Sequence, residues 1–274
     1  MVGIFGEYFH MMNNVSLRLL RIAARLWFAV TCLGQAVFAY YILMHYGRSA
    51  ALGQLETWNA VNPHFYVHGD VRGNIIFGLH VAFAAIITIL GPLQLVDALR
   101  ARAPRFHRVS GRIYIVSAIL ISAAGLYLTW VRGAVGGPVM AVAITMNGLI
   151  ILGCAILTIR NAMQRKFAAH QQWAVHLFLA MSGVWFFRVF FMLWMFIFRA
   201  PVGFDPGTFT GPFLTGLSVF VYILPQGIAA VYFHIRRNGS SLQRALFSGF
   251  LVLMALGMGL GSVAATLGMW LPRL

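Results

Sequence analysis

The chain has 274 residues, of which 61% are hydrophobic and only 9% are charged. Soluble globular domains carry about 25% charged residues, so this composition excludes a water-soluble fold and makes the lipid bilayer the expected partner. A formal charge of +15 would suggest nucleic acid binding in a soluble protein. Here the cations lie in short segments between apolar runs, where they set orientation and meet anionic headgroups. No nucleic acid partner is therefore expected.

Seven apolar runs are long enough to cross a bilayer as α-helices. They cover residues 26–44, 73–96, 112–131, 136–159, 173–198, 212–235 and 246–270. The fold class that follows is an all-α polytopic membrane protein with about seven transmembrane helices. Residues 1–14 lack the basic start and apolar stretch of a cleavable signal, so we expect the first run to remain as an anchor.

The distribution of Lys and Arg predicts the orientation of these helices. Of the 19 cations assigned to loops, 14 lie before the first run or after the second, fourth and sixth runs, and 5 lie on the opposite side. By the positive-inside rule, this asymmetry predicts a cytoplasmic N-terminus and an outer C-terminus.

We expect residues 1–274 to form a single membrane domain with four parts. Residues 1–25 are predicted to be a cytoplasmic segment with a short interfacial helix, because Arg18, Arg21 and Arg25 recur at helical spacing. Residues 47–72 form an outer loop, residues 73–198 a four-helix core, and residues 212–270 two C-terminal helices. The two cysteines, Cys32 and Cys154, each lie inside an apolar run, so no disulfide framework is expected.

All five carboxylates, Glu7, Glu56, Asp70, Asp97 and Asp205, lie in loops or at helix ends. Pumps and proton relays normally place Asp or Glu within a span, so this pattern disfavours a carboxylate-driven transporter. Nucleotide-binding, zinc-protease and serine-hydrolase motifs are also absent from the sequence. No catalytic residue is predicted.

Histidines are the candidate ligands that remain. His80 lies within the second helix, while His107 and His170 open the third and fifth helices at the predicted cytoplasmic face, with His176 further into the fifth. Both cytoplasmic histidines follow basic stretches, "RARAPRFHRVSGRIY" and "RNAMQRKFAAHQQWAVH", which indicates a weak repeat of two-helix units. A four-helix bundle with inward histidines suits haem b, since imidazole binds iron axially. We expect His107 and His170 to approach each other within about 12 to 14 Å.

Arg188 is a charged residue within the fifth helix, and we expect it to face the same interior cavity as His80 in the outer half of the bundle. A charge in a span usually faces a partner, and no span carries a carboxylate, so a haem propionate, a quinone oxygen or a phosphate are the candidates. Hydrogen bonds to backbone carbonyls are the structural alternative. A further cluster, His64, His68 and Asp70 in "HFYVHGD", has the residue types of a zinc or copper site.

Three segments resemble a known family. They are "GLHVAFAAIITILGPLQL", "RFHRVSGRIYIVSAILISAAGLYL" and "RKFAAHQQWAVHLFLAMSGVWFFRV". Together they are similar to the bacterial membrane proteins grouped as domain of unknown function 2306, over about residues 75–190. The resemblance implies a bacterial inner membrane protein. It singles out the following residues: His80, Gly91, Pro92, His107, Arg108, Gly111, Arg112, Tyr114, His170, Trp173 and Arg188.

The leading hypothesis is a redox-associated membrane protein with a haem b or quinone site in the core, working with a membrane redox partner or quinone. His80, His107, His170, Arg112 and Arg188 are the predicted cofactor-binding residues, and the three histidines are the candidate axial ligands. The histidine layout also has an analogy with four-helix haem proteins of the cytochrome b561 type. Two alternatives stand beside it: a non-enzymatic protein that handles small molecules or metals, and an accessory subunit of a membrane complex.

Overall fold

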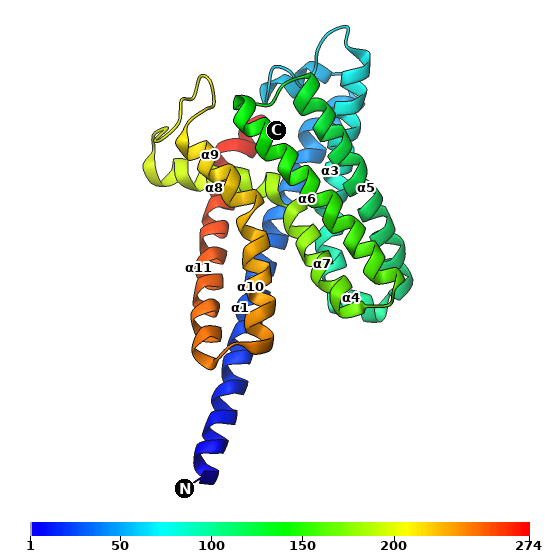
Figure 1. Cartoon of the computed structure of the whole chain (residues 1–274). Coiled ribbons are helices and arrows are strands. Elements are labelled where there is room, and N and C mark those ends of the chain that lie inside the picture. The colour runs from blue at the N-terminus through cyan, green and yellow to red at the C-terminus, as the bar shows by residue number, and fades with distance from the viewer. Residues whose placement is uncertain (1) are drawn as a thin grey trace.

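The computed structural model describes the backbone of residues 2–274 and the side chains of residues 13–274. It is built of helices, and the described residues contain no β-pairing beyond one isolated bridge between Asp205 and Thr210. Six helices are long and apolar enough to cross a membrane, or seven if one bent pair counts as a single span (Figure 1). The all-α polytopic prediction is therefore confirmed. Only 28–44% of the residues in the most apolar stretches of these six helices are buried, which leaves a large apolar surface for contact with lipid.

The first span differs from its prediction. Helix α1 (Val2–Ile42) is continuous, and a π-helical turn (Leu43–Gly47) and α2 (Arg48–Ala51) prolong it. Residues 1–25 thus form no helix of their own, because Arg18, Arg21 and Arg25 lie on the same helix as the span. No Gly or Pro interrupts residues 15–33, so nothing in the chain breaks the helix between the basic segment and the apolar one.

Two antiparallel hairpins form the centre of the molecule. Helix α3 (Val71–Gln94) returns through α4 (Asp97–Arg102) into α5 (Pro104–Val131), and α6 (Gly137–Met163) returns into α7 (Phe167–Met181). Their shared buried cluster draws on all four helices: Ile87, Tyr114, Ala118, Ile121, Ile151, Cys154, Ala155, Leu177 and Ala180. The predicted four-helix core is present, although only the first half of the fifth predicted helix belongs to it.

The α3–α5 register rests on small and polar residues that face each other. Gln94 donates to Ser110 at 2.8 Å, and the ring of Tyr114 lies against Gly91, where a Cβ would meet its Cε2 at 3.2 Å. Further along, a Cβ at Gly125 would meet the ring of His80 at 3.2 Å. In each of these three contacts the numbers of the two residues add up to nearly the same total, which is the pattern of two antiparallel helices. Gly91 and Gly125 therefore allow side chains of the neighbouring helix to approach.

The fifth predicted helix, residues 173–198, is broken. Helix α7 ends at Met181 and α8 (Gly183–Phe198) leaves at an angle of 51°. The break coincides with Ser182 and Gly183, a Ser–Gly pair of the kind that permits sharp kinks. Ser182 donates to the carbonyl of Phe178 at 2.7 Å and accepts a hydrogen bond from Gln35 at 2.8 Å, which fixes α1 at the bend. The span predicted over residues 173–198 is therefore a bent pair of helices and not one continuous helix.

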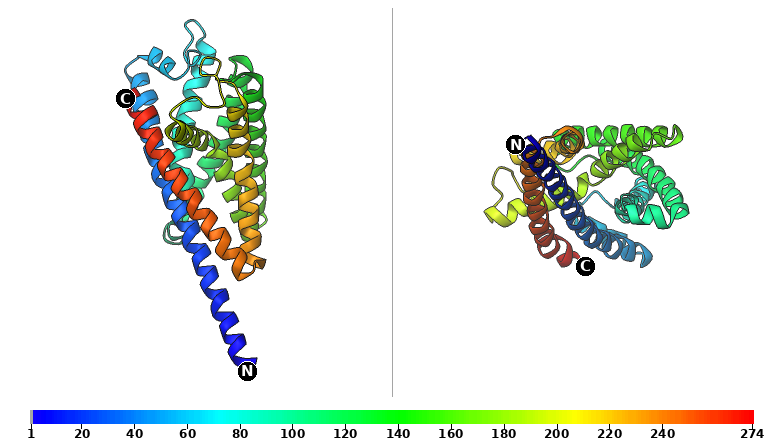
Figure 2. Two further views of the ribbon diagram at one scale, coloured as in Figure 1. Left: turned by 90° about the vertical axis from the view of Figure 1, so that its left-hand side faces the viewer. Right: turned by 90° about the horizontal axis from the view of Figure 1, so that it is seen from below.

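The C-terminal helices complete the fold beside α1. Helices α9 (Pro212–Tyr222) and α10 (Leu224–Asn238) form one span, and α11 (Ser241–Ala265) ends in a π-helical turn (Thr266–Trp270) and a short 3-10 turn (Leu271–Arg273). Helix α11 runs alongside α1 in both views of Figure 2 and also packs on α8. Arg244 donates to Asn13 and to the carbonyl of Ile235, joining α1, α10 and α11.

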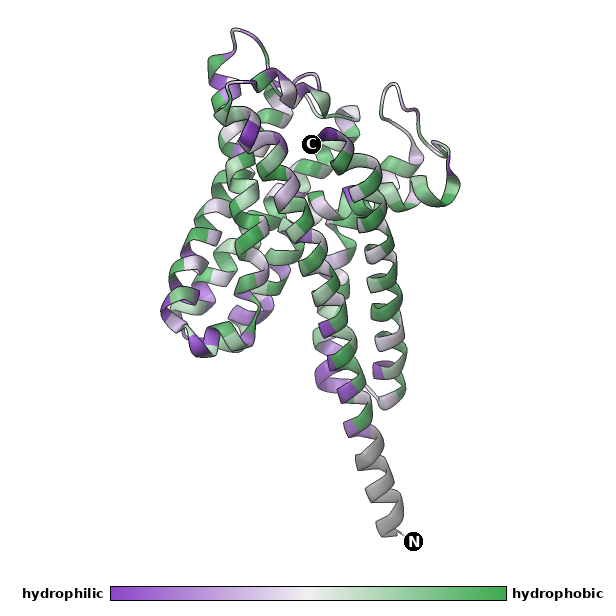
Figure 3. Cartoon of the chain, turned by 180° about the vertical axis from the view of Figure 1, so that it is seen from behind, coloured by the Kyte–Doolittle hydropathy of each residue, from purple (hydrophilic) through white to green (hydrophobic). Residues whose placement is uncertain are grey.

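The two termini lie at opposite ends of the bundle (Figure 2). The basic turn around α4, the α6–α7 turn and the α10–α11 turn all lie toward the end at which α1 begins, and the turn around α4 is visibly hydrophilic in Figure 3. This arrangement agrees with an odd number of crossings. Which face is cytoplasmic remains the prediction of the positive-inside rule.

Candidate polar sites in the helix bundle

The first candidate site lies where α5 and α7 begin, at the basic end of the bundle. His170 is the fourth residue of α7, and its Nδ1 lies 3.0 Å from the carbonyl oxygen of Thr158 on α6. A carbonyl only accepts, so Nδ1 carries the proton and donates. Neutral imidazole then has an unprotonated Nε2, which is free to bind a metal or accept a proton.

His107 occupies the corresponding position as the fourth residue of α5. It is half-buried, and its Nδ1 is buried without a hydrogen-bond partner among the described residues. His170 and Arg100 lie close enough to act on it electrostatically. The structure thus places the two predicted histidines in one neighbourhood at the basic end, on helices that begin in the same way.

Two other residues named by the sequence lie apart from this pair. His176 faces α10, where its Nδ1 donates to Oε1 of Gln226 at 2.8 Å and Gln226 returns a hydrogen bond to the His176 carbonyl at 3.3 Å. Arg112 is exposed, and no hydrogen bond is recorded for its side chain among the described residues. Neither residue therefore contributes to the interior of the bundle beside His107.

Tyr114 lies two turns along α5 on the face that His107 and Ser110 share. It is 4% exposed, and its hydroxyl is buried without a partner among the described residues. A buried hydroxyl that lacks a partner costs free energy unless water or a ligand satisfies it. The spacing of seven residues from His107 was the signal in the sequence that points to this tyrosine.

His80 lies in α3 against Gly125 of α5. Its Nδ1 is buried without a partner in the described part of the chain. A polar ring atom without a partner therefore lies in the α3–α5 interface.

Arg188 lies in α8, beyond the bend, and is partly buried. Its one recorded hydrogen bond runs from Nη1 to the carbonyl of Val184 at 3.2 Å, and its guanidinium carbon lies 5.5 Å from the ring centroid of Phe38. It acts electrostatically on His80. No hydrogen bond joins the two side chains. Two grooves of about 440 and 330 Å³ lie between α10 and α11, and neither His80 nor Arg188 lines them.

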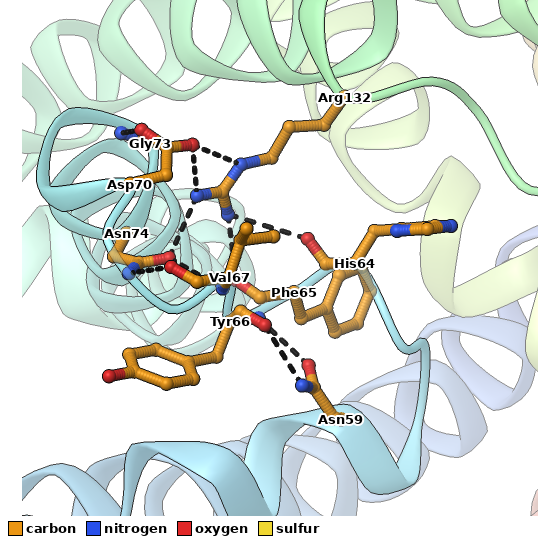
Figure 4. A network of polar contacts seen from close by, with 9 residues as sticks. All are labelled: Asn59, His64, Phe65, Tyr66, Val67, Asp70, Gly73, Asn74 and Arg132. Carbon is orange, nitrogen blue, oxygen red and sulfur yellow. Dashed lines mark hydrogen bonds and ion pairs between the residues drawn. The ribbon is translucent and has the colours of Figure 1, made fainter.

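The outer loop is held by a network that the sequence analysis did not anticipate (Figure 4). Arg132, at the end of α5, donates to Asp70 through Nε at 3.1 Å and Nη2 at 2.6 Å. It also donates to Asn74 at 2.7 Å and to the carbonyls of Phe65 and His64. Asp70 in turn caps α3 by accepting from the Gly73 N–H at 2.9 Å. This network closes the loop over the end of the α3–α5 hairpin.

The same network overturns the metal site considered for "HFYVHGD". His64 and His68 are exposed, and Asp70 is engaged by Arg132. Across the described residues, no group of three or more His, Cys, Asp or Glu side chains is arranged to hold a metal ion. The hydrogen bonds from Arg132 and then from Gly73 lower the pKa of the Asp70 carboxyl from its ordinary value. Its role is therefore that of an ionised cap and ion-pair partner. Both cysteines are free, as expected.

Comparison with known proteins supports the membrane assignment. Residues 77–205 match the family model described as "Predicted membrane protein (DUF2306)". This segment runs from within α3 to the loop after α8, and it includes His80, His107, His170 and Arg188 but not Asp70. Neither the curated proteins nor the solved structures gave a match. Residues 77–205 of the chain are therefore similar to the DUF2306 family of predicted membrane proteins.

Proposed function

We propose that this membrane protein binds haem b between His107 and His170 and passes electrons to or from a membrane redox partner or quinone. The observation that carries the proposal is the hydrogen bond from His170 Nδ1 to the Thr158 carbonyl. Histidines that bind metals usually donate their second ring N–H to a carbonyl or carboxylate, because this fixes the tautomer and aims the other nitrogen at the metal.

The donor set favours haem over an ion held by protein alone. A structural or catalytic zinc site needs at least three protein ligands, and the described residues offer no such group. A porphyrin supplies four nitrogens itself, so two axial histidines complete the coordination of iron. His107 and His170 lie in the same neighbourhood, and the buried, unpartnered Nδ1 of His107 fits a position that a bound group would complete.

Haem b supplies one-electron oxidation and reduction when it is bound. The chain's own residues have simpler tasks. Thr158 orients His170, and the Tyr114 hydroxyl provides a donor on the same face of α5 as His107. Arg100 lies near His107 and offers positive charge to an anionic edge such as a propionate. The proposed setting is a bacterial inner membrane, with the histidine end toward the cytoplasm.

Substitution of single histidines tests the proposal. His107→Ala and His170→Ala should each remove the Soret absorbance of the purified protein or convert a six-coordinate spectrum into a five-coordinate one, while far-UV circular dichroism stays helical. His68→Ala is the matched control, because this histidine is exposed in the outer loop, and its spectrum should equal that of the wild type. If both core variants keep the wild-type spectrum, the two histidines are not the ligands.

A further inference from the structure

Two arginines near the outer end of the bundle differ in how far their donors are used. Arg132 makes five recorded hydrogen bonds, which match the five N–H groups of a guanidinium. Arg188 makes one, to the carbonyl of its own helix one turn earlier. Arg132 is therefore a satisfied structural residue, whereas most of the donors of Arg188 have no protein acceptor within the described residues.

A second guanidinium lies in the same neighbourhood. Tyr46, at the end of the first span, is 6% exposed and has both Arg188 and Arg273 as electrostatic neighbours. His45 beside it donates from Nδ1 to the Arg273 carbonyl at 2.9 Å, which leaves its buried Nε2 unpartnered among the described residues. Residues from the first span, α8 and the C-terminal turn thus converge here.

The charges of this cluster are not balanced by protein groups. The ion pairs found among the described residues join Arg100 to Asp97 and Arg132 to Asp70, and none involves Arg188 or Arg273. Inside a bilayer a lone guanidinium is costly, and such residues normally face a partner. Aromatic rings lie in this neighbourhood: Arg188 lies over Phe38, whose ring centroid is 5.2 Å from that of Trp270. These rings supply packing and no countercharge.

We infer that Arg188, Arg273 and Tyr46 form a binding site for a phosphate group at the outer end of the bundle. Two guanidiniums and a phenol present donors and positive charge to one acceptor-rich, negatively charged group, and arginine matches phosphate geometry with paired N–H donors. The phosphate belongs either to the headgroup of an anionic phospholipid or to a small soluble phosphate. This site is separate from the histidine pair and does not depend on the proposed haem.

Binding is measured on the full chain in detergent and phosphate-free buffer, by tryptophan fluorescence, since Trp270 lies in the cluster. One arm titrates phosphatidylglycerol, with phosphatidylcholine as its comparison, and the other titrates inorganic phosphate. The wild type should show saturable binding in one arm, which identifies the source of the phosphate. Arg188→Gln and Arg273→Gln should each weaken that binding at least about tenfold, since each removes a charge-assisted contact.

Arg72→Gln is the matched control. Arg72 also lies over an aromatic ring, at 5.5 Å from the Tyr127 centroid, but it is exposed and stands outside the cluster, so its variant should bind within about twofold of wild type. Arg188→Lys keeps the charge and should lose only part of the affinity, which separates recognition from misfolding. Absence of saturation in both wild-type arms, or wild-type affinity in Arg188→Gln, would overturn the inference.

Discussion

Gly257 and Gly261 lie one turn apart on α11, yet the structure assigns them different roles. A Cβ at Gly261 would fall closer than van der Waals contact to the carbonyl oxygen of Val189 on α8 and 2.8 Å from its Cγ1. A Cβ at Gly257 would meet only Leu193 Cδ2, at an ordinary 3.7 Å. The close approach of α8 to α11 therefore depends on Gly261 and not on Gly257.

Alanine substitution at each glycine measures that difference. Gly261→Ala should be less stable than Gly257→Ala by about 1–3 kcal/mol, which is the usual cost of overpacking when the neighbour is backbone and cannot give way. Both variants exchange Gly for Ala in the same helix, so the gain in helix propensity, up to about 1 kcal/mol, cancels in the comparison. The difference isolates the contact with Val189.

The assay is unfolding in mixed micelles by titration with sodium dodecyl sulfate, followed by far-UV circular dichroism. Gly249→Ala serves as a third variant, because a Cβ there meets nothing within 4 Å, and it should match Gly257→Ala. Equal midpoints for Gly261→Ala and Gly257→Ala would refute the packing of α8 against α11, and with it the bend at Ser182 that brings α8 there.

Two further predictions concern the ends of the bundle. Reporter fusions should place the loops after α3, α6 and α10 on the same side as the N-terminus and residue 274 on the other side; a shared side for both termini would mean that α7 and α8 do not form one span. The Asp70–Arg132 ion pair should make the outer loop sensitive to acid. The pKa of Asp70 is lowered in the folded protein, chiefly by Arg132, so its stabilising effect is complete above the unfolded pKa of about 3.9 and is lost as pH falls through the folded value. The protection of residues 59–70 against hydrogen exchange, relative to the intrinsic rate at each pH, should then fall in acid, and Asp70→Asn should show lower protection at neutral pH and a smaller change with pH.

Much of the fold could be predicted because hydropathy and charge act locally along the chain. The apolar runs located the α3–α5 and α6–α7 hairpins, and the position of the histidines after basic stretches located His107 and His170. The bend at Ser182 was missed because hydropathy continues unchanged through it, although the Ser–Gly pair was a visible signal.

Contacts distant in sequence could not be predicted. Arg132 and Asp70 are 62 residues apart, and Gln35 and Ser182 are 147 apart, so no pattern in one chain links them. The cavity predicted between His80 and Arg188 rests on depth alone and stays a prediction. Depth does not fix the direction in which a side chain points, and after the bend Arg188 lies over the ring of Phe38 on α1.

The most direct test of the proposed haem site is the haem content of the wild-type protein, purified from membranes of cells supplied with a haem precursor. Dithionite-reduced minus oxidised spectra should show the α-band of a low-spin haem b, and a pyridine haemochrome assay should give about one haem for each chain. Protein that is folded by circular dichroism yet shows no Soret band would contradict the account of His107 and His170 as axial ligands.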